Sequence, residues 1–275
     1  MPVLLVPATT VTPRENFSWN YMSAFDAEGR PYCTVTLPNH AMSDMQVSAE
    51  YVVHAIRAMH TTSRSRVQIV AHSQGGVVAR WALRFWPDLR ALVDDYVAFA
   101  PPNHGTLVAD GLCVPDCAPA VWQQTYHSRF VTAVNSYEET FPEVSYTVIY
   151  THSDEIVQPN LDAHGSSALS GPVGQVTNVA VQDICPEDSS EHLAVGTYDA
   201  VAYAIAMDAL THPGPADPRR VAPSVCTGGL MPGVNPTTFA ADYGDAAATL
   251  AQVMATSPHV PAEPPLKCYV TGTCG

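Results

Sequence analysis

A strand followed at once by a helix, with a serine at the junction, is the feature that most constrains the fold of this chain. Val67 to Ala71 is a short apolar run rich in β-branched side chains, which predicts a buried strand. From Gly75 onward, small and apolar residues recur at helical spacing, which predicts a helix to about Pro87. Ser73 therefore lies on a sharp turn, and we expect the chain to build an α/β fold around it.

A serine on such a turn can serve as a nucleophile. The stretch from Ala71 to Gly75 has the pattern A-x-S-x-G, which differs from the G-x-S-x-G nucleophile elbow only in its first small residue. The helix that follows directs backbone N–H groups and a positive dipole end toward the reacting oxygen. The alternative is that Ser73 simply caps the helix of an ordinary strand-to-helix turn.

Strand and helix patterns alternate through residue 210, and no repeat or shift in composition marks a second domain. The predicted strands cover residues 3–7, 32–37, 67–71, 96–100, 145–150 and 175–181. The predicted helices cover about residues 13–25, 43–59, 75–87, 87–93, 121–136, 195–210 and 239–256. We therefore expect a single α/β domain over 1–275, with a mostly parallel, doubly wound sheet and helices on both faces. From about residue 211 we expect a C-terminal helical extension stapled by disulfides.

The charge balance excludes several classes of partner. The net charge is −14 with 12 Lys and Arg residues, which argues against a nucleic-acid partner and against electrostatic attraction to anionic membranes. No run reaches 18 apolar residues, so we expect no transmembrane helix. With 47% hydrophobic and 14% charged residues, the composition is that of a globular protein, and we expect it to be a monomer.

The cysteine spacing favours disulfides over metal binding. Cysteines occur at positions 33, 113, 117, 185, 226, 268 and 274, and none forms a spacing suited to zinc. We expect no metal and no cofactor, and three disulfides: Cys113–Cys117, Cys185–Cys226 and Cys268–Cys274. Cys33 is left over. Disulfides favour secretion, and because the sequence begins directly with a strand pattern, we expect any secretion signal to lie outside it.

An alcohol nucleophile needs a base and an orienting carboxylate, which in the α/β-hydrolase plan follow it as acid and then histidine. Asp154 comes directly after the strand predicted over 145–150, and Glu155 beside it is the alternative acid. His192 follows the last predicted strand, and His164, in the loop after the acid, is its main rival. The other nine histidines stand too early, beside the acid, or after a further helix.

Stabilisation of a tetrahedral intermediate requires an oxyanion hole. The backbone N–H of Gln74, the residue after the serine, is one expected donor. Thr9 lies in the loop after the first predicted strand, where a second donor usually resides, and its hydroxyl can add a third.

Several collinear stretches resemble the family of Candida antarctica lipase B and its bacterial relatives, in the α/β-hydrolase superfamily. The resemblance covers about residues 2 to 195 and is thin beyond them. It is carried by Leu4-Leu5-Val6-Pro7-x-Thr9, Gln46-Val47-x-x-Glu50-Tyr51, Ser73-Gln74-Gly75-Gly76, Ala98-Phe99-Ala100-Pro101, Val121-Trp122-Gln123-Gln124-Thr125 and Asp154-Glu155-Ile156-Val157-Gln158-Pro159.

The resemblance implies a serine ester hydrolase. It assigns Ser73, Asp154 and His192 as the triad, and Thr9 and Gln74 as oxyanion donors. It also implies the pairs Cys185–Cys226 and Cys268–Cys274, with the partner of Cys33 upstream of the first strand.

A narrow, apolar acyl channel is implied as well. Gln124, Ile156 and Val157 match its wall, although an apolar pair beside a loop otherwise indicates core. Pro102 replaces an aspartate that contacts the channel glutamine in the family, so we expect Gln124 to be freed. The segment 102–118 is rebuilt around its own pair of cysteines.

His72 replaces the tryptophan that the family has beside the nucleophile. We expect a wider and more polar floor to the alcohol pocket. The alternative is that His72 points into the core behind the turn.

The sequence thus predicts a secreted, metal-independent carboxylic ester hydrolase, foremost a lipase acting on acylglycerols or other hydrophobic esters, including those at a lipid–water interface. One alternative is a cutin- or polyester-type esterase with the same triad. Another is a catalytically inactive hydrolase fold that serves as a binding module.

Overall fold

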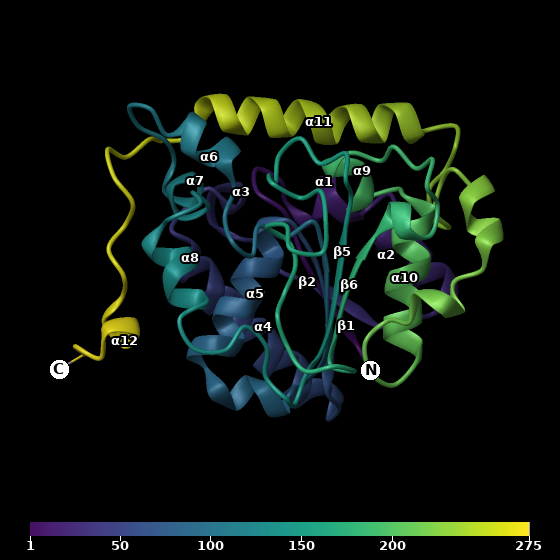
Figure 1. Ribbon diagram of the computed structural model, residues 1–275, viewed down its shortest axis with the longest axis horizontal. Helices are drawn as coiled ribbons and strands as arrows, with labels where there is room; N and C mark the ends of the chain where they lie inside the picture. The colour runs from purple at the N-terminus through teal and green to yellow at the C-terminus, as the bar shows by residue number, and fades with distance from the viewer. Residues whose placement is uncertain (275) are drawn as a thin grey trace.

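The computed structural model describes residues 1–274, and within them the strands form a parallel sheet in the order β2-β1-β3-β4-β5-β6 (Figure 1). The strands are β1 (Val3–Val6), β2 (Tyr32–Thr34), β3 (Val67–His72), β4 (Val93–Phe99), β5 (Ser145–Tyr150) and β6 (Val176–Ala180). From β1 the chain first adds β2 on one side and then places β3 on the other, so the strand order reverses between β1 and β3. Open parallel sheets form their ligand crevices beyond the carboxyl ends of the strands at such a reversal. Both the serine turn and the loop that carries Thr9 lie there.

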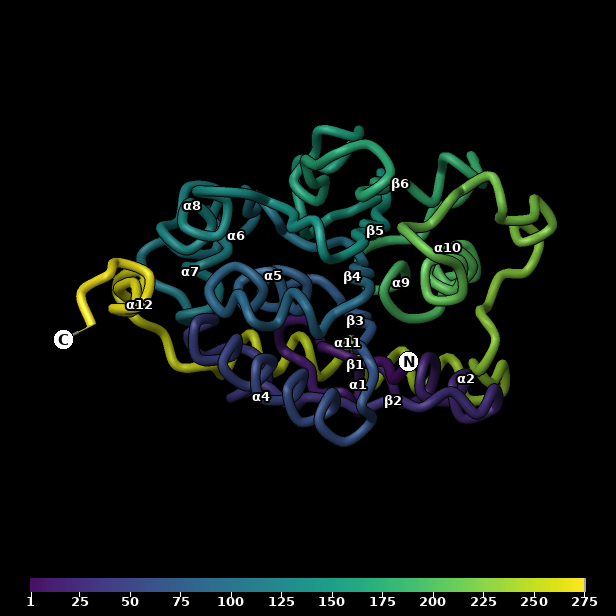
Figure 2. The backbone as a smooth tube through the Cα atoms, turned by 90° about the horizontal axis from the view of Figure 1, so that it is seen from below, coloured from purple at the N-terminus to yellow at the C-terminus, as the bar shows by residue number. Residues whose placement is uncertain are grey.

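Helices cover both faces of the sheet, as the alternating pattern predicts (Figure 2). The helices before β5 are α1 (Pro13–Phe17), α2 (Tyr21–Glu28), α3 (Pro38–Ala41), α4 (Met45–Ser63), α5 (Gln74–Phe85), α6 (Leu107–Leu112), α7 (Pro119–Gln123) and α8 (Arg129–Val134). Those after β6 are α9 (His192–Val195), α10 (Ala200–Thr211), α11 (Phe239–Thr256) and α12 (Cys268–Thr271). The short 3₁₀ helices are Pro87–Ala91, Val181–Asp183, Pro218–Arg220 and Pro223–Thr227.

Alternate residues of the central strands enter two separate hydrophobic layers. Ile69 packs in the layer with α4 and α5, whereas its neighbour Val70 packs in the layer with α2 and α10. This alternation follows from the two-residue period of a strand. Because both faces are covered, every residue of β3 is buried, which explains its continuous apolar pattern. The predicted fold class, an α/β-hydrolase fold, is confirmed.

Several predicted boundaries are wrong, and polar capping residues explain most of them. Each helix predicted over 13–25, 121–136 and 195–210 is two helices. The second helix of each pair begins after a side chain that accepts a backbone N–H: Asn20, Ser128 and Asp199. Asp44 rather than Ser43 caps α4, and β2 ends at Thr34.

The segment after Thr211 wraps around the rest of the chain. In Figure 1, α11 lies across the top of the molecule, over α1 and α9, and the chain then runs down past α8 to α12. Tyr269 of α12 packs against Trp81 and Phe85 of α5. Within the described residues, Ala246 is the single residue of α11 that is buried. The helices between residues 1 and 274 include none that is long and apolar enough to cross a membrane.

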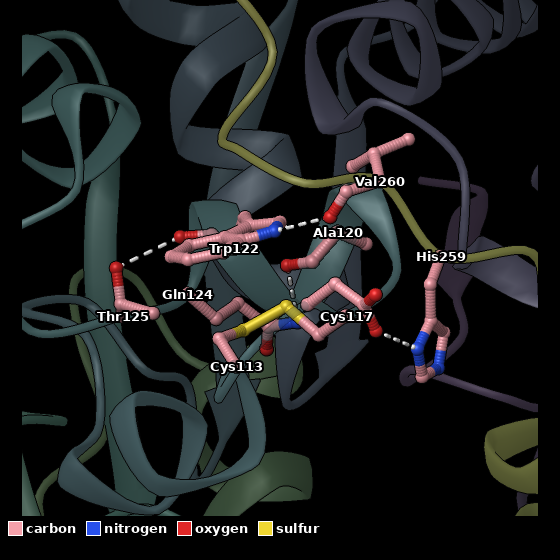
Figure 3. The surroundings of a disulfide bond; sticks show 9 residues. Cys113, Cys117, Ala120, Trp122, Gln124, Thr125, His259 and Val260 are labelled. Atoms are coloured by element: carbon pink, nitrogen blue, oxygen red, sulfur yellow. Dashed lines mark hydrogen bonds and ion pairs between the residues drawn. A yellow bond between two sulfur atoms is a disulfide. The ribbon is translucent and has the colours of Figure 1, made fainter.

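Disulfides hold this segment and the rebuilt loop after β4. In the described part of the chain they join Cys113 to Cys117, Cys185 to Cys226 and Cys268 to Cys274, and the exposed Cys33 is unpaired. Beside the first of these, Trp122 Nε1 donates to the carbonyl of Val260, 2.9 Å away (Figure 3). The N–H of Val260 in turn donates to the carbonyl of Cys117. The stapled loop and the C-terminal segment therefore support each other.

Candidate active site

Ser73 occupies a strained turn between β3 and α5. Its backbone has φ 52° and ψ −124°, a region that residues other than glycine rarely adopt. A Cβ atom at Gly75 would lie 2.5 Å from the carbonyl oxygen of Val6, so the turn requires glycine there. The Ser73 hydroxyl makes no capping hydrogen bond to α5. Simple helix capping therefore does not account for this serine.

The Ser73 hydroxyl instead lies in a hydrogen-bonded series with a histidine and a carboxylate. Ser73 Oγ is 2.9 Å from His192 Nε2, and His192 Nδ1 is 3.0 Å from Asp154 Oδ2. All three residues are buried. His192 Nδ1–H can donate to the carboxylate while Nε2 accepts from the serine, which is the arrangement that nucleophilic catalysis by serine requires.

The environment of His192 favours its charged form. Burial lowers the pKa of this imidazole, but the nearby Asp154 carboxylate and its hydrogen bond raise it, and the net shift is upward. An imidazole in this environment can hold a proton taken from a neighbouring hydroxyl group.

Asp154 is held by the loop that follows β5. Its Oδ1 accepts the backbone N–H groups of Ile156 at 3.0 Å and Val157 at 2.7 Å. Glu155, the alternative acid, accepts the backbone N–H of His192 at 3.1 Å, and among the described residues no hydrogen bond joins it to the imidazole ring. The carboxylate that faces the imidazole is therefore that of Asp154.

His164, the rival base, lies elsewhere. It lines a separate depression with His104 and Tyr126, whereas Ser73 and His192 line the main pocket. The geometry brings His192, and not His164, to the serine.

The two expected oxyanion donors lie next to each other. Thr9 Oγ1 donates to the side-chain Oε1 of Gln74 at 2.7 Å, and Gln124 Nε2 lies 3.3 Å from Thr9 Oγ1 and 3.2 Å from Gln74 Oε1. The amide of Gln124 thus joins this pair. For the Thr9 hydroxyl to serve an oxyanion, it would have to rotate away from Gln74.

An apolar pocket leads to Ser73, with an empty volume of about 660 Å³ that includes the solvent at its open mouth. Its apolar lining comes from the loop after β1, from the segments after β4 and β5, from α9 and from α11: Ala8, Val11, Val108, Ala109, Leu112, Val121, Ile156, Leu193, Leu250 and Met254. Gln124 and Ile156 lie on the wall as expected, but Val157 is not among the lining residues, and its contribution is the N–H that binds Asp154. The walls from α6 and α11 were not predicted. Ala246, Leu250 and Met254 recur every four residues, which indicates an apolar helix face but not what it covers.

His72 borders the inner end of this pocket but has no exposed surface. Its ring nitrogens lie 3.1 Å from Asn16 Nδ2 and 3.1 Å from the carbonyl oxygen of His192. No group of three or more His, Cys, Asp or Glu side chains within residues 1–274 is arranged to hold a metal ion.

Comparison with known proteins points to lipases. The family described as Lipase (class 2) matches residues 40–188. Lipase B of Pseudozyma antarctica is 37% identical over 188 residues, which cover 67% of this chain and 54% of that protein. This chain thus spans about half the length of that curated relative.

Solved structures agree on the fold. The crystal structure of Aspergillus fumigatus lipase B superposes with a TM-score of 0.90 at 32% identity, over 98% of this chain and 66% of that one. Mature Bacillus licheniformis lipase BlEst2 superposes with a TM-score of 0.55 at 15% identity, over 71% of this chain and 86% of that one, a likeness of fold alone.

Proposed function

This chain belongs to the class 2 lipase family, and from that premise we propose that it is a serine-dependent carboxylic ester hydrolase that acts on acylglycerols and other hydrophobic esters. The observation that carries the proposal is the hydrogen-bonded series of Asp154, His192 and Ser73 at the inner end of an apolar pocket. The names of the relatives support the same reaction.

Acylation begins at Ser73. His192 Nε2 accepts the hydroxyl proton as Oγ attacks the ester carbonyl, and Asp154 stabilises the imidazolium that forms. The negative oxygen of the tetrahedral intermediate accepts a hydrogen bond from the backbone N–H of Gln74. Once the Thr9 hydroxyl has rotated away from Gln74, it donates a second hydrogen bond to the same oxygen. The intermediate collapses when His192 returns the proton to the leaving alcohol, which departs and leaves an acyl group on Ser73.

Deacylation uses the same groups with water in place of the alcohol. His192 removes a proton from the water that attacks the acyl-enzyme, and then protonates Ser73 Oγ as the carboxylic acid leaves. Both halves of the reaction therefore depend on the position of His192 relative to Ser73.

The pocket supports a hydrophobic acyl group as substrate. Its apolar walls offer no charged partner beyond the catalytic groups, and each methylene that it buries is worth about 0.8 kcal/mol. The disulfides support an extracellular location, because such bonds persist in oxidising compartments.

Hydrolysis of p-nitrophenyl acetate, butyrate, octanoate and palmitate, with and without an emulsion, tests the proposal. We expect kcat/KM to rise by at most about fourfold per added methylene until the pocket is filled. A folded Ser73→Ala variant is the control. If the wild type hydrolyses none of these esters faster than Ser73→Ala, the chain is an inactive hydrolase fold and the proposal is wrong.

A further inference from the structure

A fully buried chain of hydrogen bonds connects the loop after β1 to the backbone of the proposed base. The N–H of Ala8 donates to Asn16 Oδ1 at 2.8 Å, and Asn16 Nδ2 lies 3.1 Å from His72 Nδ1. His72 Nε2 lies 3.1 Å from the carbonyl oxygen of His192. The side chains of Asn16 and His72 that form the middle of this chain are both 0% exposed.

The two ends fix the direction of every bond between them. The N–H of Ala8 can only donate, so it faces the oxygen of the Asn16 amide, and the NH₂ group is left for His72. The carbonyl of His192 can only accept, so His72 Nε2 carries the proton and Nδ1 accepts. His72 is thus a neutral imidazole in a single tautomer. The 3.3 Å approach of Asn16 Oδ1 to His72 Nδ1 adds no bond, because neither atom then carries a hydrogen.

Protonation of His72 would break this chain, since an Nδ1–H would face the NH₂ group of Asn16. Burial, aided by repulsion from His192, lowers the pKa of His72 to about 3. The imidazole is therefore neutral at any pH at which the proposed reaction runs.

The His72 ring is also held sterically against α9. A Cβ atom at Gly196 would lie 2.3 Å from Cδ2 and Nε2 of the imidazole, so the backbone that ends α9 rests directly on the ring. The ring centroids of His72 and His192 are 5.3 Å apart. The His72 imidazole thus contacts both His192, which begins α9, and Gly196, which follows its last residue.

We propose that His72 is a positioning residue that sets α9, and with it the His192 imidazole, at the correct distance from Ser73, and that Asn16 extends this link to the loop that carries Thr9. The proposal rests on the esterase function proposed above. It gives His72 a different task from the expected floor of the alcohol pocket, because His72 acts through His192 rather than on the substrate. Displacement of a catalytic group by 1 Å can cost about 10²-fold in rate.

The two tasks differ in the half-reaction that they affect. The alcohol has already left when deacylation begins, so contacts between a pocket wall and the alcohol affect acylation and not deacylation. A residue that positions His192 must change both half-reactions, because His192 transfers the proton in each.

His72→Phe and His72→Gln separate these effects. Phenylalanine fills similar space but forms neither hydrogen bond, whereas glutamine offers one acceptor and one donor side by side, like the neutral imidazole. The matched control is His60→Phe. His60 Nδ1 also contacts a carbonyl, that of Ser65, but at the end of α4, on the opposite edge of the sheet.

Acylation and deacylation are measured by stopped flow on esters that share one acyl group and carry ethanol, p-nitrophenol or 1-phenylethanol. For His72→Phe we expect both rate constants to fall about 10- to 100-fold for every ester, with KM little changed. We expect His72→Gln to recover most of the loss and His60→Phe to match the wild type.

Deacylation of His72→Phe at the wild-type rate would overturn the proposal, as would a loss confined to the ester of 1-phenylethanol. If His72→Phe does not fold, His72→Asn replaces it, because the shorter amide can reach Asn16 but not His192. Equal deacylation by the Asn variant and the wild type would then be the contrary result. An inactive wild type would instead refute the esterase function itself, and this proposal with it.

Discussion

The loops at the carboxyl ends of the strands and the segment after Thr211 both line the same pocket, but different interactions hold them in place. At the sheet edge, Ser73, Asp154 and His192 are buried and bonded to one another. The helix α11 places half-buried side chains on the pocket, and its polar attachments to the rest of the chain are part-buried or exposed. Its Asp245 pairs with Arg14, and both side chains are more than half exposed.

Because of this difference, we expect one region to determine the catalytic rate and the other to determine the selectivity among esters. Buried groups with satisfied hydrogen bonds have one arrangement, so the sheet edge can hold reacting atoms at fixed distances. Exposed ion pairs contribute only about 0–1 kcal/mol each, so α11 is held by smaller increments. We expect substitutions at the carboxyl ends of the strands to alter kcat for every ester. We expect substitutions in α11 to alter the preference among esters.

The largest effect is expected at the base. His192→Ala should lower kcat about 10⁴- to 10⁶-fold, because the members of a triad act as a unit. His164→Ala is the matched control and should remain near wild type. A spared His192→Ala variant together with an inactive His164→Ala variant would show that the base is wrongly assigned.

A smaller loss is expected at the proposed oxyanion donor. Thr9→Val keeps the shape and the backbone N–H but removes the hydroxyl, so kcat should fall about 10²- to 10³-fold with KM little changed. Thr9→Ser, which retains a hydroxyl, should recover much of the loss. Steady-state kinetics of Thr9→Val at the wild-type kcat would exclude the hydroxyl as a donor.

The buried imidazole of His72 should also make the stability of the fold depend on pH. The pKa of His72 is about 3 in the folded chain, against about 6.5 when unfolded, so the unfolded state binds more protons between these values. The free energy of unfolding should therefore fall as the pH drops from 7 to 5, by about 2 kcal/mol for this group.

Comparison of wild type with His72→Gln isolates this contribution. Burial raises the pKa of Asp95 to about 7, which acts in the opposite direction, but Asp95 is present in both proteins and its effect cancels. Between pH 7 and pH 5, the change in the free energy of unfolding measured with urea should be more destabilising in the wild type than in His72→Gln, by about 2 kcal/mol. Equal changes in the two proteins would mean that His72 is protonated in the folded state.

The smallest effect is expected in α11. Replacing Leu250 or Met254 by Ala removes part of the apolar wall, worth about 1 kcal/mol for a half-buried side chain, or about fivefold in kcat/KM. The loss should appear with palmitate esters and not with acetate. Gln252→Ala, on the exposed side of the same helix, is the control. Equal losses on both esters would show that α11 also affects the sheet edge.

What could be predicted from the sequence follows the same division. The turn at Ser73, the alternating strands and the order of acid and histidine are local or topological features, and they led to the correct fold. The breaks at Asn20, Ser128 and Asp199 were missed because helical periodicity continues across a cap.

Contacts between residues far apart in the chain could not be predicted from the sequence. The position of α11 depends on side chains more than two hundred residues away, such as Arg14. The orientation of His72 depends on the close approach of Gly196 and on the amide of Asn16, neither of which has a local signal. Val157 matched the expected wall by position, yet its backbone N–H binds the Asp154 carboxylate.

In the proposed reaction Ser73 is a nucleophile activated by His192, and labelling with a p-nitrophenyl phosphonate probes this role. We expect stoichiometric release of p-nitrophenol, a phosphonate adduct on the peptide that contains Ser73, and labelling slower by orders of magnitude in His192→Ala. An adduct on a different residue, or active enzyme that acquires no adduct, would contradict it.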